Sequence, residues 1–198
     1  MYTAYIGMGA NLPSHAGTPE ATLAAAADRL ESLGGVTKRS SLYSTEPVGF
    51  ADQPRFVNAV IELETSLTPR ELLDGLLAIE KEFGRDRTAA IANGPRTLDL
   101  DILLFGDVKI SEPGLDIPHP RLAERKFVLI PLREIASDFR DIQSGQTVSQ
   151  ILDTLRASTG NDLDAVVPIQ SEIWRAGVGG ADPGAHADPR AHDGSGAA

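Results

Sequence analysis

Two helix-start signals, each a threonine followed directly by proline, constrain the fold of this chain more than any other feature. Thr18-Pro19 precedes an alanine-rich run that ends at Gly34-Gly35, and Thr68-Pro69-Arg70-Glu71 forms a capping box for a second helix that Gly84 ends. Apolar segments with strand character flank both helices. They are Tyr2–Met8, Val36–Tyr43, Phe56–Glu64 and Thr97–Phe105. The order is therefore strand, helix, strand, strand, helix, strand.

This order predicts an α+β fold with a ferredoxin-like βαββαβ core. Two split β-α-β units would form one mainly antiparallel sheet with the helices packed on a face. C-terminal additions should extend this core. We expect a hairpin turn at Gly106-Asp107 into Val108–Ile110, a short strand at Phe127–Ile130, and a helix that Thr147 caps and that carries Ile151, Leu152 and Leu155.

The last stretch of the chain differs from the rest in composition. Residues 176–198 are rich in Gly, Ala, Pro and Asp and have no apolar period, so they cannot bury enough surface to offset their ordering entropy. We expect residues 1–175 to form one domain and residues 176–198 to be a disordered tail. His186 and His192 are thereby set aside as ligands.

Charge and cysteine content exclude several classes of protein. The formal net charge of −10 disfavours broad binding to nucleic acids or anionic membranes. The absence of cysteine excludes a disulfide framework and a thiol nucleophile, and fits a reducing cytoplasm. The chain begins without a basic segment ahead of an apolar one, and no run approaches the ~18 apolar residues of a membrane helix. We therefore expect a cytoplasmic protein.

The sharpest local feature is the segment from Gly94 to Phe105, which contains Asp99 and Asp101. Strand side chains alternate between faces, so these two carboxylates should point the same way, about 7 Å apart, with Leu98, Leu100 and Ile102 pointing into the core. Two carboxylates on one face suit Mg²⁺, which often takes one or two protein carboxylates and completes its shell with water and phosphate oxygens. A metal site for a nucleotide is the resulting hypothesis.

The alternative is that both aspartates belong to the solvated face of an amphipathic strand. Against this stand Arg96, which follows Pro95, and Arg85 and Arg87 in the preceding loop, because arginine presents planar donors suited to phosphate oxygens. Carboxylates beside arginines are the arrangement of phosphoryl transfer. The chain contains no P-loop motif, and Gly7-Met8-Gly9 lacks the third glycine of a dinucleotide fingerprint. We expect those glycines to permit tight turning and close backbone approach instead.

His119 lies between Pro118 and Pro120, close in sequence to Arg121 and Arg125. From the residues alone, a phosphate-facing role and a surface-loop role are equally reasonable. His15 has only small and polar sequence neighbours and is expected to be a loop residue.

From about Tyr5 to Ala136 the chain resembles the 6-hydroxymethyl-7,8-dihydropterin pyrophosphokinase family of folate biosynthesis. The resemblance depends on several motifs in order: Gly9-Ala10-Asn11-Leu12, Asp52-Gln53-Pro54 before Phe56-Val57-Asn58-Ala59, Gly84-Arg85-Asp86-Arg87, the segment Gly94 to Ile102, and Pro118-His119-Pro120. It implies an ATP-dependent diphosphotransferase that moves pyrophosphate from ATP to the hydroxymethyl oxygen of the pterin and leaves AMP.

The resemblance also implies roles for individual residues. Asp99 and Asp101 would hold two Mg²⁺ ions, with Arg85 and Arg96 as the other catalytic residues. The nucleotide would be bound by Glu80, Arg85, Arg87, Arg96, Ile102, His119 and Arg125. The pterin would be bound by Thr45, Val48, Phe56, Asn58 and Phe127. The two phenylalanines would stack on the ring and the amide of Asn58 would hydrogen-bond its edge.

Two other functions remain open at this point. A ferredoxin-like sheet can bind single-stranded RNA, although the net charge and the aspartates on a strand argue against it. A catalytically inactive relative is the other alternative. For the active enzyme we expect a monomer whose partners are ATP and the pterin, with no nucleic acid and no membrane.

Overall fold

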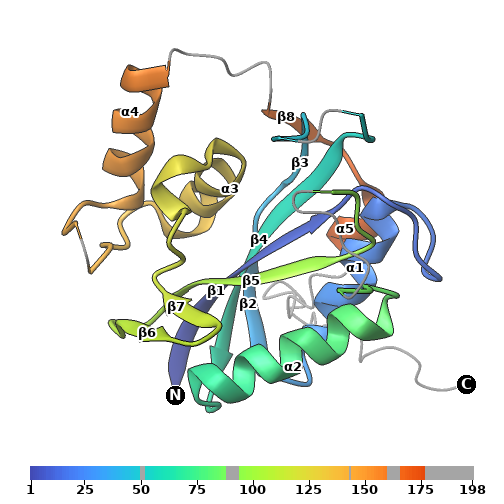
Figure 1. The fold of residues 1–198 in the computed structure, drawn as a ribbon, viewed down its shortest axis with the longest axis horizontal. Helices are drawn as coiled ribbons and strands as arrows, with labels where there is room; N and C mark the ends of the chain where they lie inside the picture. The colour runs from blue at the N-terminus through green and yellow to red at the C-terminus, as the bar shows by residue number, and fades with distance from the viewer. Residues whose placement is uncertain (50–51, 88–93, 143, 160–165, 177–198) are drawn as a thin grey trace, which may run out of the picture.

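The computed structural model describes residues 1–49, 52–87, 94–142, 144–159 and 166–176. Its centre is a six-stranded antiparallel sheet with the spatial order β5-β1-β4-β3-β8, and β2 pairs with β4 beside β3 (Figure 1). The strands are β1 Tyr2–Ala10, β2 Gly35–Arg39, β3 Leu42–Thr45, β4 Phe56–Thr65, β5 Asp99–Phe105 and β8 Val166–Ile169. β4 separates β1 from β2 and β3, and β1 separates β4 from β5, so each β-α-β unit is split by one strand. The α+β class with a mainly antiparallel sheet is confirmed.

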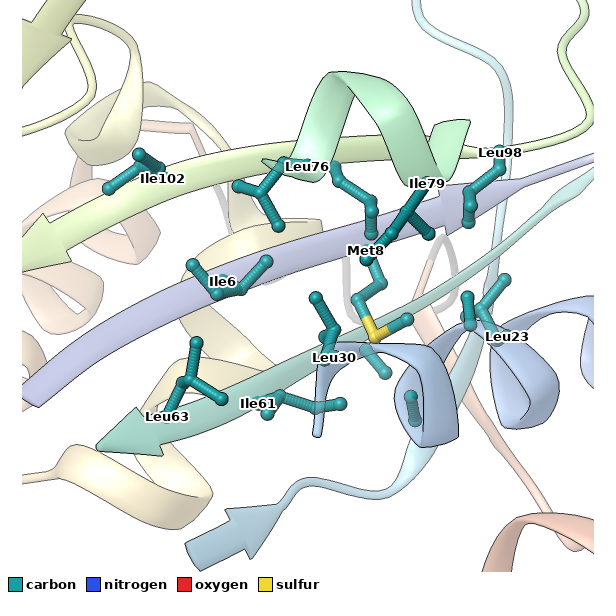
Figure 2. Packing of buried hydrophobic residues seen from close by; sticks show 14 of the residues in the cluster. Ile6, Met8, Leu23, Leu30, Ile61, Leu63, Leu76, Ile79, Leu98 and Ile102 are labelled. Atoms are coloured by element: carbon teal, nitrogen blue, oxygen red, sulfur yellow. The ribbon is translucent and has the colours of Figure 1, made fainter. Parts of the chain in front are cut away.

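Helices α1 (Pro19–Leu30) and α2 (Pro69–Glu82) cover one face of this sheet. Both begin as predicted: Thr18 accepts a hydrogen bond from the amide of Ala21, and Thr68 forms the reciprocal capping box with Glu71. The core lies between these helices and the sheet, and Figure 2 shows its central side chains. They include Ile6 and Met8 of β1, Leu23 and Leu30 of α1, Ile61 and Leu63 of β4, and Leu76 and Ile79 of α2.

Helix α3 (Lys126–Ala136) covers the opposite face of the sheet, and α4 (Val148–Thr159) packs against α3 (Figure 1). A second apolar cluster joins them to Val60 of β4 and Leu103 of β5. The predicted cap of α4 is confirmed, because the Thr147 hydroxyl accepts a hydrogen bond from the amide of Gln150 at 3.2 Å. The sheet is therefore buried on both faces, which explains why nearly all of β4 is buried rather than every second residue.

The predicted strand at Phe127–Ile130 is wrong, because these residues form the first turns of α3. A four-residue apolar run fits a buried helix as well as a strand. Here the buried positions Val128, Leu129, Leu132 and Ala136 recur at helical spacing.

The predicted turn at Gly106-Asp107 is present, with the amide of Val108 donating to the carbonyl of Phe105 at 3.0 Å, but the predicted hairpin is wrong. The chain that follows does not return along β5. The Pro113-Gly114 turn, with Gly114 at φ 75°, instead pairs β6 (Ile110–Glu112) with β7 (Leu115–Ile117) in a separate two-stranded sheet.

The predicted strand Val36–Tyr43 is interrupted at Ser40, which separates β2 from β3. The hydroxyl of Ser40 accepts a hydrogen bond from the amide of Val60, and its carbonyl accepts one from the indole of Trp174 at 2.7 Å. Trp174 belongs to the short helix α5 (Glu172–Ala176), which packs against α1 and, like β8, was not predicted from the sequence. The rest of the predicted tail, residues 177–198, lies outside the described residues.

The turn after α1 packs directly on β4. A Cβ added to Gly34 would lie 2.3 Å from the carbonyl oxygen of Glu64, whereas one added to Gly35 would meet nothing within 4 Å. Among the residues that the structure describes, no helix is long and apolar enough to cross a membrane.

Candidate active site

All the sequence-predicted site residues except Glu80 and Ile102 gather on the sheet face that α3 covers. Strand register places them: Asp99 and Asp101 of β5 lie opposite Gly9 and Gly7 of β1, Gly9 lies opposite Asn58 of β4, and β3 continues the face with Thr45 opposite Phe56. Directly opposed residues in an antiparallel pair point to the same face. These side chains therefore line one pocket of about 680 Å³.

Gly7 and Gly9 form the middle of the pocket floor. Both lie within β1, so the predicted turn at Gly9 is wrong. A Cβ on Gly9 would lie 3.0 Å from Oδ1 of Asn58, and one on Gly7 would lie 3.1 Å from the Leu103 side chain. Their missing side chains keep the floor open between the acidic and the apolar ends of the pocket.

The acidic end is built around Asp99. Its Oδ2 accepts a hydrogen bond from Nη1 of Arg96 at 2.7 Å, and its Oδ1 lies 3.4 Å from Nη2 of Arg85. The prediction that Leu98, Leu100 and Ile102 point into the core is confirmed. Because the two aspartates alternate with these core residues, both carboxylates face the pocket, where Asp99 is 24% and Asp101 39% exposed at the side chain.

Asp101 lies at a greater distance from its positive neighbours. Its Oδ2 is 3.9 Å from Nε2 of His119 and 3.9 Å from Nη1 of Arg125. Burial, together with the charge of Asp99, raises the pKa of Asp101 above its ordinary value. Burial lowers the pKa of His119 and that of Arg125, and for Arg125 the nearby charge of Arg121 adds to the effect. The structure thus places His119 in the pocket and not on an outer loop.

Asn11, which the sequence marks only as part of a motif, anchors the Arg96 segment. Its Oδ1 accepts the backbone amide of Arg96 at 2.7 Å, and its Nδ2 donates to the carbonyl of Pro54 at 3.0 Å. The guanidinium of Arg96 lies over the ring of Phe56, 5.0 Å from its centre. The only sequence signal for this role was an Asn directly after an apolar strand. Its partners could not be predicted, because they are distant in sequence.

Glu80 and Ile102 are not part of the pocket wall. Glu80 is buried beneath it, with a side chain 1% exposed, where it accepts the amide of Leu100 at 2.8 Å and pairs with Arg87 at 2.6 Å. Burial raises the pKa of Glu80 against the opposing effect of these partners. The side chain of Ile102 packs in the core (Figure 2). Glu80 therefore orients β5 and Arg87, which does line the pocket.

The other end of the pocket carries the predicted pterin-binding residues Thr45, Val48, Phe56, Asn58 and Phe127. The amide of Asn58 donates to the Thr45 hydroxyl at 2.8 Å, which leaves its carbonyl oxygen toward Gly9. Phe127 reaches the pocket from α3, and Arg125 lies 5.7 Å from the centre of its ring.

Among the lining residues that were not predicted are Leu155 of α4 and Val166 of β8. No local motif marks either of them, because β8 joins the pocket only through its pairing with β3. Residues 88–93, which precede the Gly94 motif, lie outside the described residues.

The donor set fits a magnesium ion that shares its shell with a phosphate. Within the described part of the chain, no group of three or more His, Cys, Asp or Glu side chains could hold a metal ion by itself. Two carboxylates on one face suffice for Mg²⁺ when substrate phosphates supply the other oxygens. A cation between them would also relieve the repulsion that contributes to the raised pKa of Asp101.

Comparison with known proteins agrees with this arrangement. A 2-amino-4-hydroxy-6-hydroxymethyldihydropteridine pyrophosphokinase of Pseudomonas aeruginosa is 45% identical over 150 residues, which cover 75% of this chain and 88% of that protein. The Bacillus subtilis protein of the same name is 42% identical over 162 residues, which cover 80% and 93%.

A crystal structure of a Plasmodium falciparum HPPK-DHPS triple mutant with pteroate superposes with a TM-score of 0.66. At 15% identity it shows similarity of fold alone, and it covers 86% of this chain. This chain spans about half the length of that one, 47%. The family model described as 7,8-dihydro-6-hydroxymethylpterin-pyrophosphokinase matches residues 5–137. The chain therefore belongs to the 7,8-dihydro-6-hydroxymethylpterin-pyrophosphokinase family.

Proposed function

We propose that this chain transfers the pyrophosphoryl group of ATP to the hydroxymethyl oxygen of 6-hydroxymethyl-7,8-dihydropterin and releases AMP. The observation that carries the proposal is that one sheet face holds both ends of the site. Carboxylates and arginines lie at β5, and an amide with aromatic rings lies at β3, β4 and α3. A donor of phosphate and a flat, neutral acceptor can therefore meet over the glycines of β1.

The arginines at the acidic end would position the triphosphate. Arg85 and Arg96, which pair with Asp99 in this structure, would contact phosphate oxygens and neutralise charge as bonds rearrange, and Arg125 and His119 would do so beside Asp101. Asp99 and Asp101 would hold Mg²⁺, which would supply positive charge beside the phosphate oxygens. Arg87, held by Glu80, would complete the nucleotide contacts.

At the other end, Phe56 and Phe127 would stack on the pterin ring while Asn58 hydrogen-bonds its edge. Asn58 can do this with its carbonyl oxygen, because its amide nitrogen is already held by Thr45. Val48, 56% exposed, lines the pocket and is accessible to contact the pterin. The core position of Ile102 leaves only its backbone for a nucleotide contact.

The comparisons give no support to the RNA-binding alternative or to an inactive relative. A monomer of residues 1–175 with a tail, located in a reducing cytoplasm, stays a prediction from the sequence.

Product analysis tests the proposal directly. Incubation with ATP, Mg²⁺ and the pterin should yield AMP and a pterin diphosphate in equal amounts. The formation of ADP, or no turnover by the folded protein, would contradict the proposal.

A variant pair tests the metal ligands. Asp101→Asn should reduce kcat by about a thousandfold or more, since metal-bound charge stabilisation contributes several kcal/mol. Asp107→Asn is the matched control, because Asp107 lies just beyond the same strand and is exposed outside this pocket. Normal turnover in Asp101→Asn would remove Asp101 from the metal site.

A further inference from the structure

The C-terminal part of the chain supplies one side of the pocket. Leu155 of α4 and Val166 of β8 both line it, and both lie beyond residue 137, where the family match ends. Val166 belongs to the second apolar cluster and Leu155 packs against it, so packing fixes both positions. The family match does not include these two residues.

Register shows which end of the pocket Val166 faces. Val166 is paired with Thr45, and Thr45 is paired with Phe56, so the three side chains lie next to one another on the same face. Thr45 in turn accepts the hydrogen bond of Asn58 at 2.8 Å. Val166 is therefore one strand beyond the residues proposed to bind the pterin.

Distance separates Val166 from the phosphate end. β8 and β5 form opposite edges of the main sheet. The four strand-to-strand steps between them span roughly 19 Å. A side chain on β8 therefore lies beside the proposed position of the flat, uncharged pterin and far from Asp99 and Asp101.

We propose that Leu155 and Val166 form an apolar wall that contacts the pterin and sets which pterins the site accepts. This inference depends on the proposed function. Such a wall excludes water from one edge of the ring and limits the size of substituents there. It makes the C-terminal α4–β8 segment a specificity-determining part of the site.

β8 offers a matched pair of substitutions for the test. Val166 is 9% exposed and faces the pocket, whereas its neighbour Val167 is 45% exposed and points to the other side. Val166→Ala removes two methyl groups and should raise KM for the pterin roughly fivefold to tenfold. KM for ATP should change less than about twofold, and Val167→Ala should leave both values unchanged.

Two further variants distinguish a loss of pterin contact from a folding defect. Val166→Thr keeps the shape and strand preference of valine but places a hydroxyl in the wall. It should raise the pterin KM, and a thermal midpoint lowered by only a few degrees would show that the variant is still folded. Leu155→Ala should repeat the selective effect from α4.

The outcomes are distinct. A selective rise of the pterin KM in the Val166 and Leu155 variants supports the wall. An unchanged pterin KM in folded variants, or an equal or larger rise of the ATP KM, overturns it. A wild-type protein without pterin turnover would instead refute the proposed function.

Discussion

Replacing Asn11 by alanine should both destabilise the protein and slow the transfer, because this side chain ties the end of β1 to two other segments. Asn11 is 3% exposed. Its Oδ1 accepts the amide of Arg96 at 2.7 Å, and its Nδ2 donates to the carbonyl of Pro54 and to Oε1 of Gln53 at 3.0 Å each. Alanine would leave the Arg96 amide and the Pro54 carbonyl without these partners.

The expected magnitude follows from those two groups. Leaving a buried donor or acceptor unpaired costs about 1–3 kcal/mol. Pro54 is exposed, so its carbonyl can bind water instead, and the free energy of unfolding should fall by about 1–3 kcal/mol, mainly through the Arg96 amide. Arg96 would keep its backbone pairing to Asn11 and Leu12 through its carbonyl oxygen but lose the side-chain anchor. A displacement of its guanidinium by about 1 Å can reduce kcat by up to a hundredfold.

Urea unfolding followed by circular dichroism, together with steady-state kinetics, measures both effects. Gln53→Ala is the control, because it removes one of the two acceptors of Nδ2 and leaves the Arg96 and Pro54 bonds in place. It should cost less than about 1 kcal/mol. An Asn11→Ala protein with the wild-type midpoint and kcat would refute the role assigned to Asn11.

Three other predictions concern stability, each measured by denaturant unfolding. Gly34→Ala should cost about 1–3 kcal/mol because its Cβ would collide with a carbonyl of β4, while Gly35→Ala should stay within about 0.5 kcal/mol; equal effects would contradict the packing. Burial alone would raise the pKa of Glu62, but three side-chain hydrogen bonds lower it below its ordinary value. The stability advantage of the wild type over Glu62→Gln should therefore be present at pH 7 and shrink as the pH falls through the lowered pKa. An advantage that does not change with pH would contradict this. Trp174→Phe should cost about 1 kcal/mol through loss of the Ser40 hydrogen bond, and no change would show that this bond does not hold α5.

Local signals predicted the elements whose structure is set within a few residues. The caps at Thr18 and Thr68 depend on atoms three residues away, and both helices begin where those caps predict. The shared face of Asp99 and Asp101 follows from the two-residue period of a strand, whatever the partners of that strand are.

Elements that depend on distant partners were beyond sequence reasoning. The apolar run at Phe127–Ile130 does not show whether it will pair with a sheet edge as a strand or pack on a sheet face as a helix. Here it packs on a face, as part of helix α3. β8 is four residues long and exists by pairing with β3, about 120 residues earlier in the chain. Val166 therefore could not be recognised as a pocket residue.

The central claim is that Asp99 and Asp101 hold a divalent cation shared with the triphosphate, at one end of a pocket that binds the pterin at the other. Anomalous scattering from a crystal grown with Mn²⁺, a non-hydrolysable ATP analogue and the pterin tests this most directly. Manganese peaks are expected in contact with both carboxylates, with the pterin beside Phe56 and Asn58. A bound nucleotide whose manganese contacts neither aspartate would contradict it.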